Sequence, residues 1–135
     1  MRTSTSLAAI ALLLASACSR TSPVAPSEPG TFVMAPGQAV SYGALSVTFV
    51  GVSADSRCPG DAQCIQFVVG DATVVLATTI RGSSNRYDLQ INDAMKRRVA
   101  NAGFLIELSE LSPYPFLHRP IAPDDYRATI VISRD

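Results

Sequence analysis

The chain has 135 residues, contains no tryptophan, and balances 11 basic side chains against 11 acidic ones. Its length fits a single domain with its own hydrophobic core, and not two. A neutral chain lacks the extended positive field with which proteins attract nucleic acids, so we expect no nucleic-acid partner.

Residues 1–17 have the organisation of an export signal. Arg2 supplies an early positive charge, an apolar run covers residues 7–14, and three small residues at 15–17 form a cleavage stretch. The apolar run is too short to cross a bilayer, which takes about 20 residues. We therefore expect residues 1–17 to be a signal peptide that is removed.

Cys18 stands directly after the cleavage stretch, and this arrangement resembles the N-terminus of bacterial lipoproteins. The resemblance implies that Cys18 is acylated and that the lipid bilayer is a partner of the mature protein. It also implies a location in the bacterial cell envelope, where Ser19 favours the outer membrane, on its periplasmic or surface face, over the inner one. The alternative is a plain secretory signal that leaves Cys18 as a free thiol.

The three cysteines are an odd number for an exported protein. Cys58 and Cys64 lie six positions apart and can close a small disulfide loop, which leaves Cys18 for the lipid. A redox site is the first alternative, although such sites usually have the C-x-x-C spacing. A zinc site is the second, but His118 is the only histidine that could complete it. We therefore expect a structural disulfide, with no metal and no cofactor.

The segment 18–30 is rich in proline and serine and predicts an extended tether, because it offers few apolar side chains to bury. The folded domain is expected to cover residues 31–135.

This domain has the sequence pattern of an all-β protein. Apolar residues alternate with polar ones in several short runs, and each such run predicts a half-buried strand. The alternating runs lie at 45–49, 87–91, 104–108 and 126–132, and more continuously apolar runs lie at 64–69 and 72–80. Turn residues separate the runs. The spacing predicts one antiparallel β-sandwich or small barrel of about 7–8 strands.

Two local features refine this prediction. The alternation slips after Phe49, and Gly51 at that point indicates a β-bulge. Residues 93–100 fit a short helix that begins after Asn92 and fit an edge strand nearly as well, so both alternatives remain open.

The stretch Asp55-Ser56-Arg57-Cys58-Pro59, followed by Cys64, is the most distinctive part of the domain. It resembles a D-S-R-C-P…C pattern in a group of small, uncharacterised exported bacterial proteins. A weaker likeness extends to the preceding strand and to residues 113–115 and 125–129. The pattern often has an aromatic residue two positions after the second cysteine, where this chain has Gln66. The resemblance implies a disulfide and a β domain, and it implies no activity.

The sequence offers little for catalysis. His118 is the only imidazole, no G-x-S-x-G motif is present, and the spacing of the acidic residues singles out no pair. We therefore expect a non-catalytic envelope lipoprotein that acts through binding or structural contacts, with an envelope protein as a further partner. An inhibitor of a lysozyme or protease is the alternative, and a small hydrolase is a third hypothesis.

Loops carry most binding residues in proteins, and two loops are the candidates here. They cover residues 57–63 and 113–125. The candidate contact residues in them are Arg57, Asp61, Tyr114 and His118.

Overall fold

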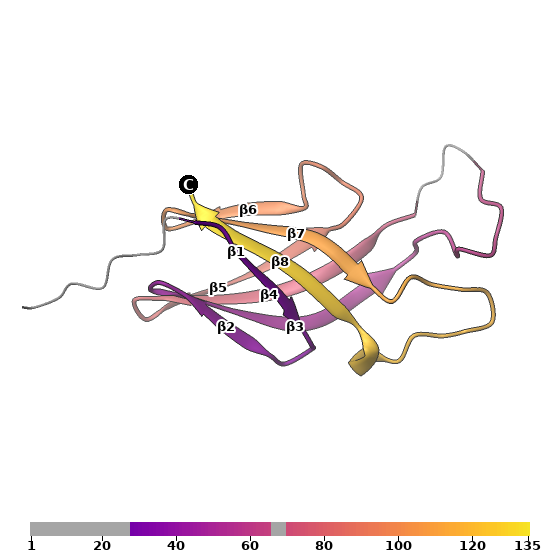
Figure 1. The fold of residues 1–135 in the computed structure, drawn as a ribbon, viewed down its shortest axis with the longest axis horizontal. Helices are drawn as coiled ribbons and strands as arrows, with labels where there is room; N and C mark the ends of the chain where they lie inside the picture. Colours follow the sequence, from indigo (N-terminus) through magenta and orange to yellow (C-terminus); the bar gives the residue numbers. More distant parts are fainter. Residues whose placement is uncertain (1–27, 66–69) are drawn as a thin grey trace, which may run out of the picture.

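A computed structural model describes residues 28–65 and 70–135. These residues form two antiparallel sheets packed face to face, with strand orders β1-β8-β7-β6 and β2-β3-β4-β5 (Figure 1). The strands are β1 (Gly30–Met34), β2 (Ala39–Tyr42), β3 (Leu45–Asp55), β4 (Ala72–Ile80), β5 (Ser83–Gln90), β6 (Arg98–Asn101), β7 (Phe104–Ser112) and β8 (Arg127–Arg134). A short 3-10 helix, η1 (Pro123–Asp125), precedes β8. The predicted all-β sandwich is confirmed.

The core lies between the two sheets, where the alternating pattern places it. In β3, Leu45, Val47 and Phe49 are buried, whereas Ser46 and Thr48 between them are half-buried. Each fully buried aliphatic or aromatic side chain of this size stabilises the fold by about 1.5–3 kcal/mol. The largest of them come from both sheets: Met34, Leu45, Phe49, Leu76, Ile106, Leu108, Ile130 and Ile132.

The predicted bulge is present in β3. The pairing of β3 with β4 shifts between Phe49 and Gly51, and again between Val52 and Ala54. Bulges bend a strand and increase its twist. The bent part of β3 leads to Asp55, which the next section places in the candidate site. The apolar run 72–80 is confirmed as β4, whereas Cys64 and Ile65 are not in a strand and residues 66–69 lie outside the described part.

The segment 93–100 is a turn followed by an edge strand, so the helix alternative is wrong. The Asp93 carboxylate accepts the backbone N–H groups of Met95 and Lys96 and closes a single turn. The chain then pairs with β7, with Val99 opposite Ile106. This pairing half-buries Val99 against the core. A helix at the open edge of the sheet would bury Val99 less directly.

The two ends of the sandwich differ in structure. The start of β1 and the end of β8 lie at one end, since Gly30 pairs with Ile132 (Figure 1). At that end the Tyr42 hydroxyl donates to the Glu28 carbonyl at 2.6 Å. The loops that follow β3 and β7 project from the opposite end (Figure 1). Within the described residues, no helix is both long enough and apolar enough to cross a membrane.

Candidate functional site

The candidate site is built from two loops at the same end of the sandwich. We call residues 56–65 the disulfide loop and residues 113–125 the proline loop. The predicted disulfide between Cys58 and Cys64 is confirmed, with the two Cα atoms 6.0 Å apart. Together the two loops form what we call the loop end.

Arg57 links the two sheets beneath these loops, although only 5% of the residue is exposed. Its Nε and Nη2 atoms donate to the two carboxylate oxygens of Asp55 at 2.9 and 2.7 Å, which is a bidentate pair. Its Nη1 atom donates to the Leu111 carbonyl at 2.7 Å, and Nη2 also donates to the Pro113 carbonyl at 2.9 Å. The guanidinium lies 5.2 Å from the centre of the Tyr114 ring. One cation therefore joins the end of β3 to the end of β7.

Tyr126, just before β8, completes this network by donating its hydroxyl to Asp55 Oδ2 at 3.0 Å. Burial alone would raise the pKa of Asp55, but the hydrogen bonds and charge of Arg57, aided by Tyr126, hold that pKa below its ordinary value of 3.8. Burial and the neighbouring carboxylate raise the pKa of Tyr126 above its ordinary value of 10.0. Asp55 is therefore a charged structural group at neutral pH.

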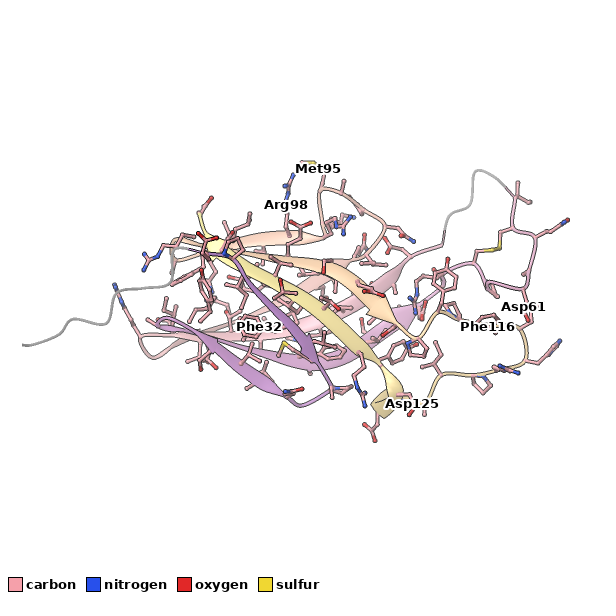
Figure 2. The ribbon with its side chains drawn as sticks, viewed as in Figure 1. Phe32, Asp61, Met95, Arg98, Phe116 and Asp125 are labelled. Atoms are coloured by element: carbon pink, nitrogen blue, oxygen red, sulfur yellow. A yellow bond between two sulfur atoms is a disulfide. The ribbon has the colours of Figure 1, made fainter. Side chains whose placement is uncertain are left out.

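The two loops are also joined directly to each other. Gly60 N donates to the Pro115 carbonyl at 2.9 Å, and Leu117 N donates to Asp61 Oδ1 at 2.7 Å. A Cβ atom at Gly60 would lie 3.5 Å from the Phe116 ring, so the two backbones and the ring are close together. Figure 2 draws Asp61 and Phe116 beside each other between the loops. The loop end is thus one cross-linked unit.

The proline loop contains a tight turn at residues 116–119, which we call the tip. Arg119 N donates to the Phe116 carbonyl at 3.3 Å, and His118 takes a left-handed conformation with φ 57°. Three large apolar side chains of the proline loop are exposed here: Tyr114, Phe116 and Leu117. Ile65 is exposed on the disulfide loop. Two open hollows of about 410 and 290 Å³ share the lining residues Phe116, Arg119, Pro120 and Ile121.

The structure brings the four predicted contact residues to this end of the molecule, but in different roles. Asp61, Tyr114 and His118 are exposed. Arg57 is buried, so its side chain positions the loops and is not presented to a partner. Cys18, the predicted acylation site, lies outside the described residues.

Sequence reasoning missed several residues of the site. Asp55 was only one of many turn acids, although its position two residues before Arg57 is a usable signal for a local ion pair. Phe116, Leu117 and Arg119 gave no periodic signal, because a turn presents them and not a strand. In residues 28–65 and 70–135, no three His, Cys, Asp or Glu side chains form a group that could hold a metal ion.

Comparisons of the chain with family models, with curated proteins and with solved structures give no match. The geometry of the loop end is therefore the basis for the functional proposal below.

Replacing both Cys58 and Cys64 with serine is expected to lower the free energy of unfolding by about 2 kcal/mol, because opening so short a loop frees the unfolded chain. Urea denaturation followed by circular dichroism measures this loss. The matched control is the wild-type chain with a reducing agent, which should lose the same amount. An unchanged midpoint in both samples would show that the disulfide does not stabilise the fold.

The stability of the domain is expected to fall in acid through Asp55. The pKa of Asp55 is lower in the folded chain than in the unfolded chain. As the pH falls, the unfolded chain therefore binds a proton at Asp55 more readily, and this favours unfolding. The contribution is complete above about pH 4 and is lost as the pH falls through the folded-state pKa. Urea denaturation between about pH 2 and about pH 7 measures the free energy of unfolding. This free energy should fall less steeply in acid for Asp55→Asn than for the wild type. The exposed control Asp88→Asn should keep the wild-type slope.

Proposed function

We propose that this protein is a lipid-anchored lipoprotein of the bacterial envelope whose β domain binds a partner protein through the loop end and does not catalyse a reaction. The observation that carries the proposal is the set of exposed apolar side chains on two cross-linked loops. Phe116 and Leu117 are 46% and 45% exposed, and Tyr114 is 51% exposed. Such clusters of exposed aromatic and aliphatic side chains are typical of binding surfaces.

The rigidity of the loop end supports binding further. A loop that is already ordered loses little entropy when it binds, so more of the contact energy contributes to affinity. Here the disulfide, the Arg57 network and the Gly60 and Asp61 hydrogen bonds all restrict the same two loops. Loops that only connect strands do not need this many cross-links.

The state of the polar groups supports a non-catalytic role. Both carboxylate oxygens of Asp55 accept hydrogen bonds from Arg57, and one also accepts from Tyr126. Asp61 accepts the Leu117 N–H group. These acids are engaged in holding the loops, which is a different use from proton transfer to a substrate.

The position of the chain ends agrees with an anchored role. Gly30 lies at the end of the sandwich opposite the loop end (Figure 1). If Cys18 is acylated, the predicted tether of residues 18–30 would span about 45 Å at most. The loop end would then be the part of the domain farthest from the lipid attachment.

The test is photo-crosslinking in the native bacterium, with a photoreactive amino acid in place of Leu117. We expect a discrete adduct with one envelope protein, because Leu117 is one of the exposed apolar side chains of the tip. The matched control is the same amino acid in place of Met95, which is 83% exposed on the turn before β6. The proposal fails if Leu117 yields no adduct, or if both positions yield the same products.

A further inference from the structure

The tip is convex and stiff, and this shape restricts the partners that fit it. It projects beyond the strands at the loop end (Figure 1). Its turn is closed by the hydrogen bond from Arg119 N to the Phe116 carbonyl, and Asp61 ties it to the disulfide loop through Leu117 N. A stiff protrusion is complementary to a cleft, and contacts within a cleft exclude water better than contacts on a flat surface.

The tip offers a cationic side chain, Arg119, to a partner. Arg119 is exposed, forms no ion pair with any residue of the described ranges, and lines both hollows beside Phe116. Two carboxylates lie nearby: Asp61 accepts the Leu117 N–H group, and Asp125 of η1 lines the smaller hollow together with Arg119. Neither of them forms an ion pair with Arg119. A carboxylate in the cleft of a partner would therefore complement the unpaired guanidinium of Arg119.

Glycoside hydrolases have such a cleft. Their catalytic machinery is a pair of carboxyl groups about 5–9.5 Å apart that flank the bond to be cut. A guanidinium can bind a carboxylate through two parallel hydrogen bonds, and the attraction is stronger in a cleft sheltered from water. The apolar side chains of Phe116 and Leu117 would contact the walls of the cleft on either side of this pair.

We propose that the tip enters the active-site cleft of a glycoside hydrolase of the lysozyme class and blocks it, with Arg119 paired to a catalytic carboxylate. This inference rests on the proposed function, because it names the partner of the loop end. In the cell envelope such an inhibitor would protect the wall polysaccharide from an enzyme that cuts it.

A protease is a poorer fit to the same tip. Protease clefts accept an extended segment of chain, whereas the tip is a closed turn with a left-handed residue at His118. Substrate-like binding would require the Arg119 to Phe116 hydrogen bond to open. Proteases therefore serve as the comparison in the test.

The experiment measures inhibition of three purified lysozymes, of the chicken, goose and invertebrate types, by the full chain in detergent. Subtilisin and trypsin are assayed in parallel. We expect 1:1 inhibition of at least one lysozyme, an inhibition constant that rises with salt, and no inhibition of either protease. Arg119→Glu should weaken inhibition by about 30-fold or more, because it replaces an attraction to the carboxylates with a repulsion.

The controls separate a specific tip contact from general charge effects. Arg86→Glu makes the same charge change at an exposed residue of β5 and should leave the inhibition constant unchanged. Because Arg119 is exposed, its variant should keep the wild-type melting temperature, which is measured alongside. The inference is overturned if no lysozyme is inhibited, if a protease is inhibited instead, or if Arg119→Glu inhibits as well as wild type. A Leu117 crosslink obtained together with any of these results would leave the proposed function standing and reject only the lysozyme-class partner.

Discussion

Replacing Arg57 with methionine is expected to lower the free energy of unfolding by about 3–5 kcal/mol. The Asp55 side chain is only 10% exposed and would lose its cation, and the Leu111 and Pro113 carbonyls would lose their donor. A loss of this size is a large share of the roughly 5–15 kcal/mol that stabilises a typical domain. Urea denaturation of the purified chain, followed by circular dichroism, measures it.

A double-mutant cycle identifies the cause of this loss. Asp55→Leu alone and Arg57→Met alone each leave one charge without its partner, whereas the double variant removes both charges. We expect the double variant to lose about 1–3 kcal/mol less free energy of unfolding than the sum of the two single losses. Additive losses would mean that Arg57 acts only through its bonds to the Leu111 and Pro113 carbonyls and not through the ion pair.

Strands β3, β5, β7 and β8 could be predicted from the sequence because each buries one face, and burial of one face imposes a period of two. The bulge at Gly51 was predictable for the same reason, since a shift in the pattern marks a shift in pairing. Strands β1 and β2 lie outside the runs that the sequence analysis picked out. The segment 93–100 was ambiguous because its one core residue, Val99, cannot define a period. Only its pairing with β7 decides between strand and helix.

The site was less predictable, because its residues are related by distance in space and not by spacing in the chain. Arg57 was singled out as an exposed contact residue, yet its partners Leu111 and Pro113 are more than fifty positions away. No local pattern connects them. The disulfide was predictable because its two cysteines lie six residues apart and the predicted export would favour their oxidation.

Replacing Cys18 with alanine is expected to move most of the protein from the membrane fraction to the soluble fraction of its bacterial host. Two or more acyl chains hold a protein durably at a bilayer, and without the thiol no such chains can be attached. Fractionation with immunoblotting measures the distribution. Intact mass spectrometry of the wild type should show a chain that begins at Cys18 and carries acyl groups. The matched control, in which Cys58 and Cys64 are both serine, should remain in the membrane fraction.

An uncleaved signal could itself retain the Cys18→Ala variant at the membrane, so a second variant is needed. In it, a plain secretory signal is joined directly before Ser19, and the mature chain has no cysteine at its start. This chain should be recovered in the soluble fraction after export, because the thiol that would carry the acyl chains is gone. If it still sediments with the membrane, the anchor is not Cys18. The tether would then have no anchoring role, and the proposed placement of the loop end far from the lipid would have to be abandoned.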